Sequence, residues 1–587
     1  MTAGSPTMCS AFQATVERDP GAVAVRTAGD TRTLTFAEWA RQARELAAGF
    51  AALGVGRGSK VALMLANRPE FYPVDTAVVH LGAAPFSMYN TSSPEQIKHL
   101  LSDSGAEVVV CETQFLAAVE KGRKGTGVKH VVCIDGSGDG TLSPAEVIAA
   151  ADPEFDFESS WRAVRPDDVL TLIYTSGTTG SPKGVQLTHA NMLAMVRATI
   201  RLANGTRDER VLSFLPSAHV ADRWSALYLC MVLGNRITTV ADRAGFTAGL
   251  ADCRPTLLGA VPQVWQKLRG GIEEKLAEST GAKAKLATWA VRVGRRYSDT
   301  RLDGGRVSAG LRAQYALADR LVLAKVRAAL GLDSINIAIS GAAPVSPELL
   351  RYFNGLGIEV SDAWGMSELS GMASICPPGQ VRLGTVGKPV DGLEIRIADD
   401  GEVLVRGPLV MKGYLNKPEQ TAEVIDSDGW LHTGDIGDLD GDGYLRIVDR
   451  KKELIINAGG KNMSPSNIEN WVKAFEPLIG QAIAIGDNRK YNVALIVLDQ
   501  DAATVFAEKL GVAADPAILA SHPDVDRLVA AAVELANAKL SRVEHIRKFR
   551  IVGDFWQPGS ELLTPTMKPR RKPINERYAA AIEELYR

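Results

Sequence analysis

Residues 174–184 read Tyr174-Thr-Ser-Gly-Thr-Thr-Gly-Ser-Pro-Lys-Gly184, and this stretch decides the fold. The apolar run 169–174 before it predicts a buried strand that leads into a loop. Glycines let the loop backbone approach a ligand closely, and successive N–H groups in such a turn bind anions. We therefore predict a polyphosphate-binding loop; a flexible Ser/Gly linker is the alternative. The residues expected to contact phosphate are Thr175, Ser176, Gly177, Thr178, Thr179, Gly180 and Lys183.

The loop differs from the P-loop of nucleoside triphosphatases. Counted from Gly177, that pattern needs Gly-Lys-Ser/Thr after four residues, where this chain has Pro182, Lys183 and Gly184. The following residues, 186–189, do not read as the start of a P-loop helix. The sequence thus predicts a different class of phosphate loop.

The composition indicates an enzyme-sized globular protein. At 587 residues the chain is too long for one core, and it carries 46% hydrophobic residues with a formal net charge of -2. This charge gives no electrostatic case for nucleic acid as a partner. The six cysteines form no C-x-x-C pair, which favours reduced thiols over disulfides or zinc. We see no signal peptide or membrane-span pattern and expect a cytoplasmic protein.

The N-terminal part alternates helical and strand patterns. Residues 36–53 show the apolar spacing of an amphipathic helix, and Ser93 begins a second helix with a capping box. Residues 60–65, 107–111 and 130–134 read as short buried strands. Strands alternating with helices predict an α/β fold of parallel sheets covered on both faces.

Seven motifs, in order along nearly the whole chain, resemble those of the adenylate-forming (acyl-activating) enzymes, in particular AMP-forming long-chain fatty acyl-CoA synthetases. The motifs are 174–184, Leu215-Pro-Ser-Ala-His219, Val261-Pro-Gln-Val-Trp-Gln-Lys267, Trp364-Gly-Met-Ser-Glu368, Thr433-Gly-Asp435, Arg450 and Leu563-Thr-Pro-Thr-Met-Lys568. The resemblance implies an α/β N-terminal adenylation domain of packed, mostly parallel sheets (1–450). A hinge at 451–452 and a small mobile α+β domain (453–587) would follow.

The resemblance implies a nucleotide site in the large domain. Trp364 and Ser367 stand where the family has Tyr and Thr, which keeps a ring beside adenine and a hydroxyl near phosphate. Glu368, with Thr175, would hold Mg²⁺ through hard oxygen atoms. Asp435 would accept both ribose hydroxyls. The expected nucleotide contacts are Gly341, Ala342, Ala343, Asp362, Ala363, Trp364, Gly365, Met366, Ser367, Asp435, Ile447 and Arg450.

The acyl site has two candidate side chains with plain structural alternatives. His219 follows a strand stopped by Pro216; a lone His is more often structural, but the family places this residue beside the acyl group and phosphates. Trp265 reads first as a core aromatic, whereas the family segment lines the fatty-acyl tunnel and its Trp can gate it. The expected substrate contacts are His219, Val261, Trp265, Gly341 and Gly365.

The small domain would supply two further groups. Lys568 matches the catalytic lysine of the family, and Lys452 matches the hinge about which the small domain turns. The Gly459-Gly460-Lys461 turn would then swing in to guide the pantetheine arm of coenzyme A.

An insertion at about 268–330 is helix-rich and basic. Residues 265–330 hold 14 Lys or Arg and 6 Asp or Glu, interleaved with apolar residues. Basic amphipathic helices lie on anionic membranes, and an ordinary solvated helical face is an equally good interpretation. We expect peripheral contact with the inner face of the membrane, where fatty acids would enter.

The resemblance implies ATP-dependent conversion of long-chain fatty acids to acyl-AMP and then to acyl-CoA, with Mg²⁺ as cofactor. A fatty acyl-AMP ligase that serves a carrier protein remains an alternative, as does a non-catalytic nucleotide- or lipid-binding regulator. A short-acid ligase would need a shorter pocket. The sequence leaves open the preferred acid and the oligomeric state, a homodimer included.

Overall fold

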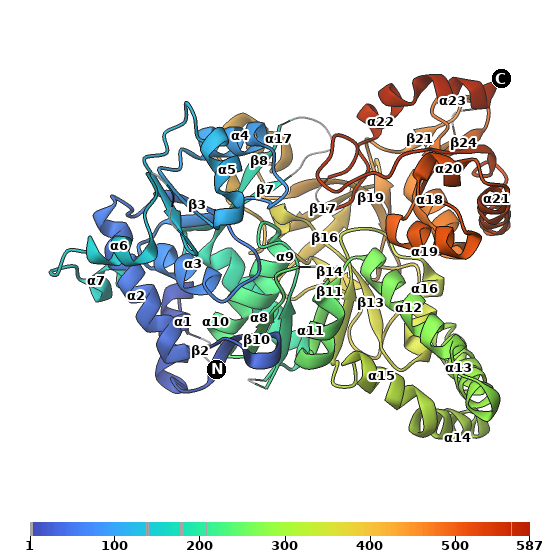
Figure 1. The fold of residues 1–587 in the computed structure, drawn as a ribbon, viewed down its shortest axis with the longest axis horizontal. Coiled ribbons are helices and arrows are strands. Elements are labelled where there is room, and N and C mark those ends of the chain that lie inside the picture. Colours follow the sequence, from blue (N-terminus) through green and yellow to red (C-terminus); the bar gives the residue numbers. More distant parts are fainter. Residues whose placement is uncertain are drawn as a thin grey trace.

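The computed structural model describes residues 4–136, 138, 140–175, 181–206, 208–242, 244–459, 461–564 and 566–587. Most of the chain forms a large body, and the residues after about 453 form a smaller one beside it (Figure 1). Helices α13 and α14 project from one edge of the large body (Figure 1).

A nine-stranded sheet is the main support of the large body. Its order is β15-β14-β13-β12-β11-β9-β10-β1-β2, and the run from β13 to β1 is parallel. The strands are β1 (Val23–Thr27), β2 (Thr33–Thr35), β9 (Arg210–Ser213), β10 (Arg236–Thr239), β11 (Leu257–Ala260), β12 (Ile337–Ser340), β13 (Val360–Trp364), β14 (Ser374–Ile375) and β15 (Lys388–Pro389). Loops after parallel strands meet at one edge, where α/β proteins bind ligands.

A second, fully parallel sheet carries the predicted N-terminal strands. Its order is β4-β3-β5-β6, with bounds β3 (Lys60–Met64), β4 (Ala84–Ser87), β5 (Val108–Cys111) and β6 (His130–Cys133). The α/β prediction is therefore confirmed, and mixed sheets add to it.

The strands before and after the predicted phosphate loop belong to a smaller antiparallel sheet, which the parallel-sheet prediction did not include. Strands β7 (Val169–Thr175) and β8 (Lys183–Thr188) pair as a hairpin, and β18 (Gly413–Tyr414) pairs with β8. The chain returns as a strand and enters α8 (His189–Ala203) only afterwards. This explains why residues 186–189 lack the signals of a P-loop helix.

Three further sheets lie in the C-terminal part of the described chain. The large body ends with the antiparallel sheet β16-β17-β19-β20, formed by β16 (Glu394–Ile397), β17 (Glu402–Arg406), β19 (Leu431–Leu439) and β20 (Leu445–Arg450). The small body has the hairpin β21 (Ile455–Ile456) and β22 (Asn462–Met463), and the sheet β23 (Ile479–Ile485), β24 (Asn492–Leu498) and β25 (Ile546–Ile551).

The predicted helices form where capping and burial agree. In α2 (Phe36–Ala52), Thr35 and Glu38 form a capping box, and the helix buries Phe36, Trp39 and Phe50. In α4 (Pro94–Ser104), Ser93 and Gln96 do the same. Other helices before residue 262 are α1 (Met8–Arg18), η1 (Ala28–Asp30), α3 (Phe71–His80), α5 (Thr113–Gly122), α6 (Pro144–Ala149), α7 (Phe157–Arg162), α9 (Val220–Asp222), η2 (Arg223–Tyr228), α10 (Leu229–Leu233) and α11 (Phe246–Cys253).

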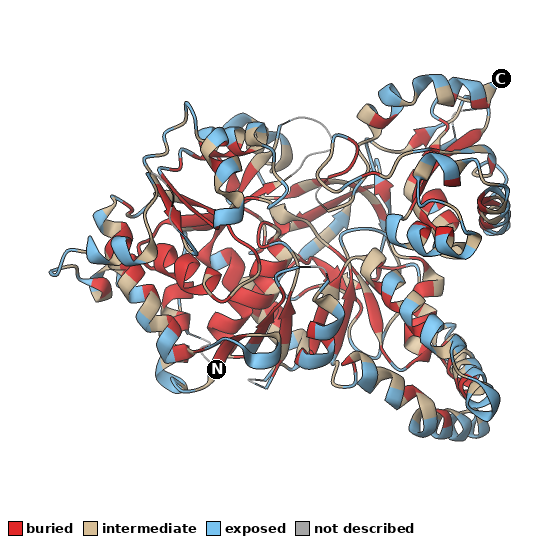
Figure 2. Cartoon of the chain, viewed as in Figure 1, coloured by how far each residue is buried: buried red, intermediate tan, exposed pale blue. Residues whose placement is uncertain are grey.

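The insertion is helical as predicted and largely exposed on its outer side (Figure 2). It contains α12 (Pro262–Ala277), α13 (Gly281–Leu302), α14 (Ala309–Ala318), η3 (Asp319–Leu323) and α15 (Ala324–Leu330). Next come α16 (Pro347–Gly355), η4 (Ser367–Leu369) and α17 (Pro418–Val424), and the small body adds α18 (Pro465–Phe475), α19 (Gln500–Leu510), α20 (Pro516–Ala520), α21 (Pro523–Asn537), α22 (Arg571–Arg577) and α23 (Ala579–Tyr586). No described helix has the length and apolar character needed to cross a membrane.

Candidate active site

A continuous cavity of ≈ 2780 Å³ runs along the junction of the two bodies and into the large body. It is lined by Thr175, Ser181 and Lys183 beside the phosphate loop, and by the segments after β12 and β13. Small-molecule sites usually measure about 300–1,000 Å³, so this cavity has room for more than one substrate. Residues 176–180, predicted to bind phosphate, lie outside the described residues.

The two groups predicted to face the phosphates and the metal are linked by one tyrosine. The Tyr414 hydroxyl donates to Oε1 of Glu368 over 2.9 Å, and the Lys183 ammonium lies 4.8 Å from the centre of the Tyr414 ring. Tyr414 itself is 8% exposed. Burial, with the nearby Glu368 charge, raises the pKa of Tyr414, so the hydroxyl keeps its proton and remains a donor.

The predicted ribose ligand has a defined set of partners. Asp435 accepts from Nε1 of Trp364 over 2.7 Å and pairs with Nε of Arg450 at 2.7 Å. Burial raises the pKa of Asp435, and the positive charge of Arg450 opposes that rise. The three predicted residues therefore come together from β13, β19 and β20.

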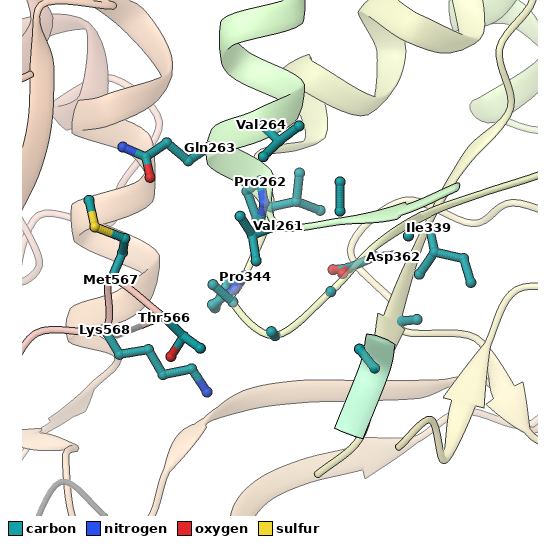
Figure 3. Close-up of a pocket in the computed structure, with 18 of the residues that line it drawn as sticks. Val261, Pro262, Gln263, Val264, Ile339, Pro344, Asp362, Thr566, Met567 and Lys568 are labelled. Atoms are coloured by element: carbon teal, nitrogen blue, oxygen red, sulfur yellow. The ribbon is translucent and has the colours of Figure 1, made fainter. Parts of the chain in front are cut away.

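Lys568 reaches into this cavity from the small body. Figure 3 shows its side chain extending toward the cavity beside Thr566 and Met567. Desolvation beside the large body lowers the pKa of Lys568, and the positive charge of Arg450 lowers it further, while Asp435 and Glu368 oppose the shift. The side chain itself remains exposed at the cavity. Lys568 therefore lines the same cavity as the groups predicted to bind nucleotide and metal, among them Glu368 and Asp435.

His219 faces the same cavity as a neutral ring. Its Nδ1 accepts the N–H of Ala221 at 3.1 Å, so the proton of the neutral imidazole resides on Nε2. Burial, followed by the charge of Lys568, lowers the pKa of His219 to about 4. At neutral pH His219 can therefore donate one hydrogen bond but carries no charge.

Tight backbone packing shapes the wall predicted to hold adenine. A Cβ on Gly365 would lie 1.9 Å from the carbonyl oxygen of Gly371, so this crossing admits only glycine. The Asp362 carboxyl points into the cavity (Figure 3), and burial raises its pKa. The remaining predicted residues on the lining are Val261, Gly341, Ala342, Ala343, Ala363, Met366, Ser367, Ile447 and Lys452.

The structure does not bring every predicted residue to the cavity. Trp265 is fully buried; its Nε1 donates to the carbonyl of Ile339 over 3.1 Å and its ring packs on Phe353. Its tunnel role stays a prediction. Gly459 and Lys461 lie on the exposed β21–β22 turn, away from the cavity lining, and Gly460 lies outside the described residues.

One branch of the cavity is apolar and passes between the insertion helices. Its lining includes Ile272, Leu276, Leu286, Leu321, Val322, Val326 and Leu330. Lys275, Lys283 and Lys325 also line this branch, and no ion pair is found for them among the described residues. An aliphatic chain suits this environment, because the branch offers mainly hydrocarbon contacts.

The donor set fits a magnesium ion. Among the described contacts Glu368 uses Oε1 alone for the tyrosine hydroxyl, which leaves Oε2 for a cation, and the Thr175 hydroxyl lines the same cavity. Mg²⁺ prefers one or two protein oxygens together with water and phosphate oxygens. The ion would neutralise charge on the phosphates when bound.

Two contacts at the cavity were not predicted from the sequence. Tyr414 was missed because its link to Lys183 and Glu368 spans distant segments; Gly413-Tyr414 before the Asn416-Lys-Pro turn was the one local signal. A second is the ion pair between Lys267 and Asp501 at 2.5 Å, which joins α12 to the small-body helix α19.

Comparison with known proteins places this site in a family. A profile of AMP-binding enzymes matches residues 12–415, and a profile of the AMP-binding enzyme C-terminal domain matches residues 452–587. The chain belongs to the AMP-binding enzyme family. This AMP-binding enzyme is 54% identical to a putative fatty-acid–CoA ligase of Mycobacterium tuberculosis over 76% of its own length and 79% of the relative. It is 38% identical to a long-chain-fatty-acid–CoA ligase of the same species over 94% and 92%.

Solved structures agree on the fold of the AMP-binding enzyme. An anthranilate CoA ligase in complex with anthranoyl-AMP superposes with a TM-score of 0.75 at 18% identity, covering 98% of each chain. An o-succinylbenzoate CoA synthetase from Bacillus subtilis, bound to its acyl-adenylate, gives 0.71 at 23% identity over 97% and 98%. At these identities the likeness concerns architecture alone.

Proposed function

We propose that this AMP-binding enzyme uses ATP to convert long-chain fatty acids into acyl-AMP and then into acyl-CoA, releasing pyrophosphate and AMP. One observation carries the proposal: Lys568 of the small body enters the cavity that holds Glu368, Asp435 and Arg450. The apolar branch beside this site supports a long aliphatic acid. The relatives at 38–54% identity are named as fatty-acid–CoA ligases, which supports the same substrate class.

The first half-reaction forms a phosphorus–oxygen bond. A carboxylate oxygen attacks the α-phosphorus of ATP, the bond from that phosphorus to the bridging oxygen breaks, and pyrophosphate leaves with the electron pair. Negative charge develops on phosphate oxygens, which preorganised cations stabilise. Lys183 and Lys568 supply positive charge, Asp435 orients the ribose, and neutral His219 can donate Nε2–H to the carboxylate or phosphate.

The second half-reaction requires another arrangement. The sulfur of coenzyme A attacks the acyl carbon, the bond to the AMP oxygen breaks, and AMP leaves. We infer that the small domain, residues 453–587, turns about 451–452 and brings the turn with Gly459 and Lys461 to the site. In support, Lys452 lines the cavity while this turn lies outside it. The closed small domain would also protect acyl-AMP, a mixed anhydride, from hydrolysis by water.

A panel assay tests the proposal. The protein is incubated with ATP, Mg²⁺ and saturated acids of increasing length, with and without coenzyme A, and the products are identified by mass. We expect acyl-CoA, with the highest rates for long chains. Acyl-AMP without thioester would indicate an acyl-AMP ligase, and the absence of any adenylate would leave a binding protein.

The enzyme would take its fatty acid from an anionic membrane surface. Leu286 and Leu321 line the apolar branch and are each 38% exposed, and Lys283 and Lys325 lie beside them without a described ion pair. Exposed apolar residues with free cations are typical of peripheral membrane contact. Arg295 does not belong to this surface, because it pairs with Asp299 and Glu348.

We predict that Lys283→Glu with Lys325→Glu weakens binding to anionic vesicles by about 30-fold or more, since each cation near such a surface contributes about 1 kcal/mol. The control, Lys121→Glu with Lys124→Glu, makes the same charge change on exposed residues at and just after the end of α5. Co-sedimentation with anionic and uncharged vesicles measures the effect. Equal binding by both double variants would contradict membrane contact at the insertion.

A further inference from the structure

We infer that Tyr414 is a positioning residue of the phosphate and magnesium site, with its hydroxyl orienting Glu368 and its ring placing Lys183. The inference deepens the proposed function, on which it rests, by assigning a residue that the motifs do not include. Tyr414 lies in β18, a two-residue strand that pairs with β8 of the hairpin around the predicted phosphate loop.

Backbone hydrogen bonds tie this strand, and the residue Met411 just before it, to two other segments. Tyr414 pairs with Val185 in β8, and the Leu415 N–H donates to the carbonyl of Gly184 over 2.8 Å. On the other side the Met411 N–H donates to the carbonyl of Glu368 over 2.9 Å. The strand therefore fixes the Tyr414 side chain relative to both the lysine and the glutamate.

The two ends of the tyrosine side chain have separate effects. The hydroxyl holds one oxygen of Glu368 at 2.9 Å, so the other oxygen is aimed at a cation. Partners of this kind typically change metal affinity about 10-fold to 100-fold. The ring holds the Lys183 ammonium at 4.8 Å by a cation–π contact, which would place this charge for a phosphate bound in the cavity.

Two substitutions separate these effects. Tyr414→Phe removes the hydroxyl and keeps the ring; Tyr414→Leu removes both. Equilibrium binding of ATP is measured by calorimetry with Mg²⁺ and with EDTA, without fatty acid or coenzyme A. For Tyr414→Phe we expect unchanged affinity in EDTA and an approximately 10-fold loss of the enhancement by Mg²⁺. For Tyr414→Leu we expect a further loss of about threefold or more in EDTA.

A double-mutant cycle with Glu368→Gln completes the test. The effect of Tyr414→Phe on the Mg²⁺ enhancement should disappear in the Glu368→Gln background, because the carboxylate that the hydroxyl orients is gone. Thermal unfolding of each variant identifies loss of fold, and Tyr414→Phe remains informative if Tyr414→Leu unfolds. Identical Mg²⁺ enhancement in wild type and Tyr414→Phe would overturn the inference. Absence of ATP binding by wild type would instead overturn the proposed function.

Discussion

Replacing Lys568 with alanine is expected to slow acyl-adenylate formation about 100-fold to 1,000-fold, the usual cost of removing one preorganised charge donor. The conversion of a supplied acyl-AMP to acyl-CoA should be nearly unchanged, because the proposed turn of the small domain would carry Lys568 out of the site before that step. Pyrophosphate release measures the first half-reaction, and thioester formation from synthetic acyl-AMP measures the second.

The pH dependence gives the same prediction an independent readout. The folded protein lowers the pKa of Lys568, so its ammonium form is lost at a lower pH than in an ordinary lysine. Adenylate formation should therefore fall on the alkaline side below pH 10.5. Lys568→Arg should remove this fall, since arginine stays charged.

Lys572→Ala is the matched control, because Lys572 is an exposed lysine close to Lys568 in the same C-terminal segment. It should leave both half-reactions unaffected. Equal losses in the two half-reactions of Lys568→Ala would show that the lysine supports the fold and does not act on the adenylation step.

Asp435→Ala should lower kcat/KM for ATP by about 100-fold or more, if Asp435 accepts the two proposed hydrogen bonds from ribose, since each charge-assisted bond is worth about 1.5–3 kcal/mol. The variant also removes the acceptor of Trp364 and the partner of Arg450. Its thermal stability must be measured beside its kinetics. Asp438→Ala, in the same strand and exposed, is the control.

A dideoxynucleotide shows whether the loss of activity in Asp435→Ala comes from the lost ribose contact. Wild type should discriminate strongly against 2′,3′-dideoxy-ATP, because the analogue lacks the two hydroxyls that would donate hydrogen bonds to the carboxylate. Asp435→Ala should lose most of that discrimination. If Asp435 had a purely structural role, the substitution would lower kcat/KM equally for ATP and for 2′,3′-dideoxy-ATP. Discrimination that persists in Asp435→Ala would contradict the assignment.

Local signals predicted the elements whose caps and apolar faces agree. Helices α2 and α4 formed at their capping boxes, and β3, β5 and β6 lie where short apolar runs placed them. The hairpin β7–β8 was harder to predict. An apolar strand before a glycine loop does not tell whether the chain returns antiparallel or enters a helix.

The sequence could not predict the contacts that residues of the site make between distant segments of the chain. The motifs named Trp364, Asp435 and Arg450 but could not predict that the indole and the guanidinium share one carboxylate. From its residues alone Trp265 reads first as a core aromatic, and only the family resemblance suggested a tunnel role. Its burial against Phe353 depends on α16. Tyr414 contacts two residues far away in sequence, so the short Gly413-Tyr414 signal could not show which residues it would meet.

Oxygen-isotope labelling tests whether the fatty carboxylate attacks the α-phosphorus of ATP. Wild-type protein is supplied with a long-chain fatty acid labelled with ¹⁸O in both carboxyl oxygens, together with ATP, Mg²⁺ and coenzyme A, and the products are weighed by mass spectrometry. If the carboxylate attacks the α-phosphorus, AMP must carry one ¹⁸O and the acyl-CoA must keep the other. Unlabelled AMP beside labelled acyl-CoA, or ADP in place of AMP, would contradict the adenylate route.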